Sequence, residues 1–217
     1  MTVSPQSGSN PPREFVLSYM NLRKSIGTIG MLLPLVLIVG KWIFQGWGIQ
    51  PSISGYYYTV MRDVFVGALW AIGIFLFSYR GHERQDEIAS NLAGFFAIGV
   101  SLFPTTPDGS AALKELIIGA VHYLFAAAFF VTLSYICLVL FRKTDQASPG
   151  PAKLLRNKVY ATCGRVMLGC IALIVVTKLP LAKTAIQSLD PVFWLESIAI
   201  VAFGFSWLVK GEALFRD

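Results

Sequence analysis

Four ionisable side chains are best placed to do chemistry in this otherwise apolar chain: Arg62, Asp63, His122 and Glu196. Each falls inside a long hydrophobic run, where an ionisable group is costly and often functional. With a helical rise of about 1.5 Å per residue, they lie roughly 5 to 9 Å below the same end of their runs. The shared depth predicts one polar site formed by several helices.

Further polar side chains flank this level. Ser54 and Tyr57 belong to the sequence SISGYYY at 52–58, directly before Arg62, and the sequence PTTPDG at 104–109 adds Thr105, Thr106 and Asp108. Together these segments predict the mouth of an outward-facing pocket. The expected ligand-binding residues are Ser54, Tyr57, Arg62, Asp63, His122 and Glu196.

The same residues permit other interpretations. A serine such as Ser52 or Ser54, paired with His122 and with Asp63 or Glu196, would suit a membrane-embedded lipid hydrolase, although no nucleophile-elbow motif marks either serine. The polar residues would otherwise serve as an internal staple in a structural or signalling subunit. The sequence leaves open whether the protein is an enzyme, and it favours a non-catalytic function.

No metal or other cofactor is expected. A catalytic zinc takes three protein ligands, and His82 is predicted on the face opposite His122. The three cysteines are an odd number and give no disulfide framework.

Composition places the chain in a membrane. Of its 217 residues 55% are hydrophobic and 14% are charged, against roughly 25% charged in soluble domains. The net charge of +6 is therefore attributed to Lys and Arg held on one side of the bilayer rather than to nucleic-acid binding. The lipid bilayer is the expected partner, and the oligomeric state is undetermined.

Six apolar runs are long enough to be spanning helices. They occupy residues 26–44, 59–79, 88–103, 116–141, 166–182 and 192–209. The predicted fold is an all-α membrane bundle. The third run is the shortest and needs independent support.

The distribution of cations gives that support. Thirteen of the 18 Lys and Arg fall in the two terminal segments and alternate loops, and three fall on the opposite side. Cytoplasmic loops are enriched in these residues. The bias predicts six spans in the inner cell membrane with both termini in the cytoplasm.

The domain division follows from these spans. Residues 1–24 are predicted to form a disordered tail and an interfacial lead-in, and residues 25–217 to form one six-helix domain with a basic connector at 142–160. Gly67 with Ala71, Ala93 with Ala97, and the alanines at 126–128 predict close packing of the second, third and fourth helices. No internal repeat supports an inverted-repeat transporter.

A resemblance adds to this interpretation. The sequences SISGYYYTVMRDVFVGALWAIGIFLFSYRG, FPTTP, PVFWLES and SWLVKGE resemble a family of small bacterial six-helix, multi-pass integral membrane proteins. The resemblance covers most of the chain after its tail. It implies a bacterial membrane protein and no particular activity. The polar residues described above, rather than the resemblance, give the expected function, which is binding or transporting a small molecule or lipid headgroup.

Overall fold

The computed structural model describes residues 13–81, 83–144, 148, 150–179 and 189–213, and these residues are all-α. Each of the six predicted runs falls on an α-helix, although the run 166–182 extends beyond the described residues. In chain order the elements are α1 (Arg13–Gln45), η1 (Ser54–Tyr58), α2 (Arg62–Ser78), α3 (Arg84–Leu102), α4 (Leu113–Tyr135), η2 (Ile136–Leu140), α5 (Pro151–Thr177) and α7 (Pro191–Lys210). Of the two short elements, η1 is a 3-10 turn and η2 is a π-helical turn that continues α4.

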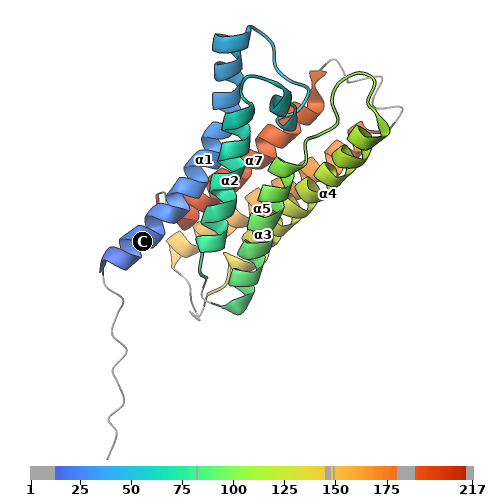
Figure 1. The fold of residues 1–217 in the computed structure, drawn as a ribbon. Helices are drawn as coiled ribbons and strands as arrows, with labels where there is room; N and C mark the ends of the chain where they lie inside the picture. The colour runs from blue at the N-terminus through green and yellow to red at the C-terminus, as the bar shows by residue number, and fades with distance from the viewer. Residues whose placement is uncertain (1–12, 82, 145–147, 149, 180–188, 214–217) are drawn as a thin grey trace, which may run out of the picture.

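The helices form a closed ring. Each α-helix packs against the next in the chain, and α7 packs against both α5 and α1. Figure 1 shows the six helices running along one common direction. Leu76, Leu133 and Trp207, from α2, α4 and α7, are fully buried in the core that the ring encloses. Side chains that point inward from different helices can therefore meet.

Glycines allow two of the helix pairs to approach closely. A Cβ at Gly73 of α2 would lie 3.1 Å from the carbonyl oxygen of Gly94 on α3, and one at Gly204 of α7 would lie 2.7 Å from that of Gly27 on α1. Small residues permit this contact because they add no side chain between the backbones. The predicted role of Gly67 is wrong, because nothing lies within 4 Å of a Cβ placed there.

Four helical stretches have the length and apolarity needed to cross a membrane, and the chain is accordingly a multi-pass membrane protein. They are Met20–Gln45, Leu113–Leu140, Pro151–Thr177 and Pro191–Lys210. By the same criteria α2 and α3 do not qualify: α2 has 17 residues, and the first turn of α3 carries charge. At about 1.5 Å per residue, α2 is roughly 25 Å long.

Two helices begin earlier than the apolar runs suggested. The first, α1, starts at Arg13, inside the predicted tail 1–24, and α5 starts at Pro151, inside the predicted connector 142–160. Proline at the first helical position is favourable, because its missing N–H has no partner there in any case. Hydropathy detects only the apolar part of a helix, whether it faces lipid or the core. Residues 1–12 of the predicted tail lie outside the described residues.

The two ends of the bundle differ in charge. We call the end formed by the start of α1, α3 and α5 and the finish of α2, α4 and α7 the basic end, and the opposite one the pocket end. The described cations of the basic end are Arg23, Lys24, Arg80, Arg84, Arg142, Lys143, Lys153, Arg156, Lys158 and Lys210, and its carboxylates are Glu83, Asp86, Glu87 and Glu212. The described charges of the pocket end are Lys41, Arg62, Asp63, Asp108, Lys114, Glu115, Lys178, Asp190 and Glu196.

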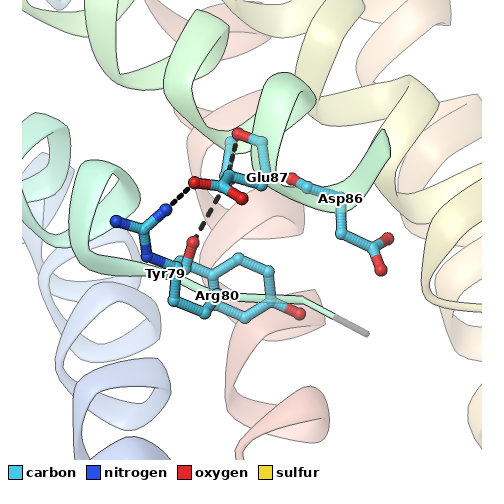
Figure 2. A network of polar contacts seen from close by, with 5 residues as sticks. Tyr79, Arg80, Asp86 and Glu87 are labelled. Atoms are coloured by element: carbon cyan, nitrogen blue, oxygen red, sulfur yellow. Dashed lines mark hydrogen bonds and ion pairs between the residues drawn. The ribbon is translucent and has the colours of Figure 1, made fainter. Parts of the chain in front are cut away.

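A tight connection joins α2 to α3 at the basic end. Arg80 forms an ion pair with Glu87, as Figure 2 shows. The Asp86 carboxylate accepts a hydrogen bond from the Glu83 backbone N–H at 3.0 Å. A Cβ at Gly81 would collide with Asp86, at 1.9 Å from its Cβ. The connection therefore depends on glycine at this position.

Candidate functional site

The η1 turn is anchored to the pocket end of the bundle by apolar side chains. Ile53 and Tyr56 are almost completely buried. The Tyr56 ring lies 6.3 Å from the ring of Phe193 on α7, centroid to centroid. Burial of large apolar side chains is the main stabilising contribution to such a contact. The turn is consequently a fixed part of the bundle, and Ser54 lies at its start.

Glu196 holds the first residues of this turn. Its Oε2 atom accepts hydrogen bonds from the backbone N–H groups of Ile53, at 2.7 Å, and Ser54, at 3.3 Å. Glu196 is partly buried in the second turn of α7. Two hydrogen bonds to one carboxyl oxygen fix both backbone groups relative to α7. One carboxylate thus links the last helix to the segment between the first two.

His122 forms the second link to the turn. The side chain is 1% exposed, and its Nε2 atom lies 2.9 Å from the Ser54 Oγ. Its Nδ1 atom lies 2.7 Å from the carbonyl oxygen of Phe103 and 3.2 Å from that of Val100. Carbonyl oxygens only accept hydrogen bonds, so Nδ1 carries the proton. In the neutral ring, Nε2 then accepts a hydrogen bond from the Ser54 hydroxyl.

A polar cavity opens beside this network. Its volume is about 620 Å³. Its walls come from the segment around η1, the α3–α4 loop, α4, the end of α5 and the start of α7: Gln50, Pro51, Ser52, Gly55, Tyr58, Thr105, Thr106, Pro107, Asp108, Tyr123, Thr177, Lys178, Asp190, Pro191, Val192 and Glu196. Drug-sized ligands occupy pockets of roughly 300 to 1,000 Å³.

Hydrogen bonds fix two walls of this cavity relative to each other. The Tyr58 hydroxyl donates to the carbonyl oxygen of Thr105 at 2.6 Å. The Thr105 hydroxyl donates in turn to the Tyr123 hydroxyl at 3.2 Å. Lys178 lies with its Nζ atom 5.3 Å from the centre of the Tyr123 ring. The cavity wall is therefore polar, aromatic and charged at once.

A second, apolar cavity lies deeper in the ring. It measures about 40 Å³, and its walls include Ser54, Phe129, Glu196 and Phe203. Glu196 borders both cavities. Ser54 borders only the inner one. The Ser54–Glu196 contact therefore lies at the boundary between a polar and an apolar space.

The structure brings together three of the six predicted site residues, namely Ser54, His122 and Glu196. Arg62 is exposed, donates to the Tyr57 hydroxyl at 2.9 Å and lies with its guanidinium carbon 4.5 Å from the centre of that ring. Neither residue borders the cavity. Asp63 is exposed and makes no side-chain hydrogen bond or ion pair with any described residue.

Depth along the helix was not sufficient to predict where the Arg62 and Asp63 side chains lie. Both lie at the first residues of α2, but they point outward, away from the ring. Lys41, at a similar level, is 7% exposed and donates to the carbonyl oxygens of Gly46 and Gly48, at 3.4 and 3.2 Å. It binds the segment that directly follows its own helix and forms no ion pair with Glu196.

Sequence reasoning missed several residues of the cavity wall. Tyr123 follows His122 directly, and Lys178 and Asp190 flank the connection between α5 and α7. No motif marks these residues. Among the described residues, no three His, Cys, Asp or Glu side chains lie close enough to hold a metal ion.

Comparison of the chain with protein-family models, with curated proteins and with solved structures found no match. The resemblance to small bacterial membrane proteins therefore stays a prediction.

Proposed function

We propose that all six helices cross the cell membrane and that the basic end faces the cytoplasm. The excess of Lys and Arg at one end supports this orientation. The packing of α2 and α3 inside the same ring as the four long helices supports six crossings. A hydrophobic stretch slightly shorter than the roughly 30 Å hydrocarbon layer is accommodated by local thinning of the bilayer.

The position of Arg84 distinguishes six crossings from four. With only the four long helices crossing, the α2–α3 connection would lie on the external side. We expect a cysteine introduced by Arg84→Cys to react with a membrane-impermeant maleimide only after the cells are opened. A cysteine introduced by Gly109→Cys in the α3–α4 loop should react in intact cells. Labelling of the first variant in intact cells would contradict six crossings.

We infer that the pocket end binds a small polar molecule or a lipid headgroup. The observation that carries this proposal is the 620 Å³ cavity, bordered by Glu196 and by the hydroxyls of Tyr58, Thr105 and Tyr123. Convergent polar groups on a concave wall are typical of ligand sites. In the proposed orientation this cavity lies at the outer face, where solutes and lipid headgroups can reach it.

Filling the cavity tests the binding proposal. We expect Val192→Trp, on the cavity wall, to abolish thermal stabilisation of the purified protein by whichever members of a metabolite and headgroup-analogue panel stabilise the wild type. Ile198→Trp is the matched control, because Ile198 lies on the same helix and is 48% exposed. Equal loss of stabilisation in both variants, or a panel without effect on the wild type, would count against the pocket.

A second candidate function is ester hydrolysis. The Ser54 Oγ to His122 Nε2 distance of 2.9 Å favours it. In this chemistry Oγ attacks the ester carbonyl carbon and passes its proton to Nε2. That proton then goes to the leaving alcohol, and water releases the acyl group from Ser54. His122 is oriented by the Phe103 carbonyl rather than by a carboxylate.

Glu196 makes hydrolysis the weaker candidate. Backbone N–H groups beside a nucleophile commonly stabilise the oxyanion, but here Glu196 already occupies those of Ile53 and Ser54. Covalent labelling of the wild type by a fluorophosphonate, lost in Ser54→Ala and kept in Ser52→Ala, would support hydrolysis. Absence of labelling leaves binding as the function. In a purely structural staple, the Ser54, His122 and Glu196 variants would misfold and no ligand would stabilise the protein.

A further inference from the structure

The described wall of the polar cavity carries more acidic than basic groups. Its charged side chains are Asp108, Asp190, Glu196 and Lys178. Three carboxyl groups thus accompany one ammonium group, and with Glu196 protonated the ratio is still two to one. The N-terminus of α7 adds about half a positive charge, which does not offset the excess. A cleft lined by one sign of charge concentrates its potential between low-dielectric walls, so this cavity attracts cations.

Asp190 is not used by its own helix. It occupies the N-cap position of α7, where an aspartate commonly accepts a hydrogen bond from the first turn. Here the side chain makes no such bond, and it makes no hydrogen bond or ion pair with any other described residue. The partly buried side chain borders the cavity instead. Its carboxylate is therefore available to a ligand.

Glu196 also has an unused acceptor. Its Oε2 atom accepts both backbone N–H groups of the η1 segment, whereas its Oε1 atom accepts no hydrogen bond from any described residue. Lys178, the one cation of the described cavity wall, forms no ion pair with it and lies over the Tyr123 ring. A partly buried carboxylate without a cationic partner is costly. A positively charged ligand would supply that partner.

The arrangement of the carboxyl groups favours an organic cation over a metal ion. A metal ion needs several ligands that converge on one point, and among the described residues no three His, Cys, Asp or Glu side chains do so. The Tyr58 and Tyr123 rings border the same cavity. Ammonium groups are attracted to the faces of such rings, and the Lys178 ammonium already lies 5.3 Å from the centre of the Tyr123 ring.

We propose that the ligand of this cavity carries an ammonium group, either as a soluble amine or in the headgroup of a lipid. The inference rests on the proposed binding function and specifies the ligand class of the same site. Asp190 and Glu196 bind the positive charge, and the tyrosine rings contact the carbon atoms attached to the nitrogen. Lys178 opposes binding, because its charge repels that of the ligand.

Matched ligands test the sign of the charge. The purified full-length protein in detergent is titrated by calorimetry with choline, ethanolamine and spermidine, with 3,3-dimethylbutanol as the uncharged analogue of choline, and with glycerol 3-phosphate as an anion. We expect at least one of the amines to bind about tenfold more tightly than both the uncharged and the anionic compound. Equal or tighter binding of either of these two would overturn the ammonium inference.

Failure of this inference is distinguishable from failure of the binding proposal. No binding of any amine, together with binding of other metabolites that is lost in Val192→Trp, would overturn the ammonium inference and leave the pocket in place. No binding of any compound would overturn both.

Substitutions of opposite effect locate the charge. Asp190→Asn should weaken binding of the amine about tenfold, because it removes a carboxylate from the wall. Asparagine tolerates the left-handed backbone at this position, where φ is 46°, so the variant should fold. Lys178→Gln should strengthen binding about threefold, a smaller change because the exposed ammonium is screened by solvent. Damage to the cavity does not produce such a gain. Absence of either change would overturn the inference.

Matched controls alter the same charges elsewhere at the pocket end. Asp63→Asn and Lys114→Gln change exposed groups that do not border the cavity. They should leave binding within about twofold of the wild type, because exposed charges outside the cavity are screened. Effects as large as those of the two wall variants would show general attraction to the protein surface and overturn the inference.

Short-chain lipids identify the source of the ammonium group. Tighter binding of dihexanoyl phosphatidylcholine than of the free amines would assign the site to a lipid headgroup, and the reverse order would assign it to a soluble amine. Either order supports an ammonium ligand. Equal or tighter binding of dihexanoyl phosphatidylglycerol, which has the same acyl chains and no ammonium group, would overturn the inference.

Discussion

The two ends of the bundle are held together by different kinds of polar contact. At the pocket end, buried or partly buried groups bind the backbone: Glu196 holds two N–H groups of the η1 segment, and His122 holds Ser54 and the carbonyl oxygen of Phe103. The basic end has buried contacts too, such as that of Asp86 with the Glu83 backbone, but it adds exposed ion pairs such as Lys143 with Glu83. Loss of one partner leaves a buried group unsatisfied in the contacts of the pocket end and a solvated group in these ion pairs.

The largest effect is expected at Glu196. Substitution by alanine leaves the backbone N–H groups of Ile53 and Ser54 without an acceptor, so Glu196→Ala should lower the free energy of unfolding by about 3 kcal/mol. Unfolding by SDS in mixed micelles measures this change. Glu196→Gln keeps one acceptor oxygen and should lose less than half as much. Equal losses in the two variants would mean that the backbone contact does not hold the turn.

A smaller loss is expected for His122→Phe. The substitution keeps a ring of similar size but removes the hydrogen bonds to Ser54 and Phe103, at a cost of about 2 kcal/mol. The same unfolding titration measures this loss.

At the basic end, Glu87→Ala breaks the ion pair with the exposed Arg80. It is expected to lower the free energy of unfolding by less than His122→Phe does. A greater loss for Glu87→Ala would invert the comparison between the two ends.

Tyr58→Phe should have a still smaller effect. The partly exposed Tyr58 hydroxyl donates to the carbonyl oxygen of Thr105, and its loss should lower the free energy of unfolding by about 1 kcal/mol. Tyr135→Phe is the control, since Tyr135 has similar exposure at the basic end and makes no side-chain hydrogen bond with any described residue. Indistinguishable unfolding curves for the two variants would contradict a structural role for this contact.

The smallest effect is expected for the Lys143–Glu83 pair. The hydrogen bond that the Lys143 ammonium donates to the Glu83 carboxylate raises the pKa of Lys143 above its ordinary value. Because the folded-state pKa is raised, the stabilisation is present below the ordinary lysine pKa of about 10.4 and is lost as pH rises through the folded-state pKa. Thermal unfolding of the wild type and Lys143→Gln should therefore converge at strongly alkaline pH. A difference that grows with pH would contradict the assignment.

Sequence alone was sufficient for the number and order of the long helices in the described part of the chain, and insufficient for their bounds and rotation. Apolar runs locate the buried and lipid-facing part of a helix, so the first turns of α5, with Lys153 and Arg156, were assigned to a connector. Depth along a helix likewise does not determine which way a side chain points. Arg62 shares the level of Glu196 but faces outward, whereas Ser54, in the preceding turn, faces the core.

The contacts of Glu196 show a further limit of prediction. Its partners are backbone N–H groups, and every residue except proline has one. Residue types therefore carry no signal for this contact. His122 was easier to predict, because a histidine in an apolar run must find partners inside the bundle. Ser54 was identified as a candidate for the same reason of polarity, although its pairing with His122 depends on the packing of η1.

The hydrogen bond between Glu196 and the backbone of Ile53 has a consequence for biosynthesis. The two residues are separated by 143 positions in the chain, and α7 is the last described helix to leave the ribosome. Until α7 inserts between α1 and α5, the ring has an open side and the η1 turn lacks its acceptor. The polar cavity is thus completed only when α7 inserts, so a nascent chain halted before α7 can contain most of the described bundle without a closed cavity.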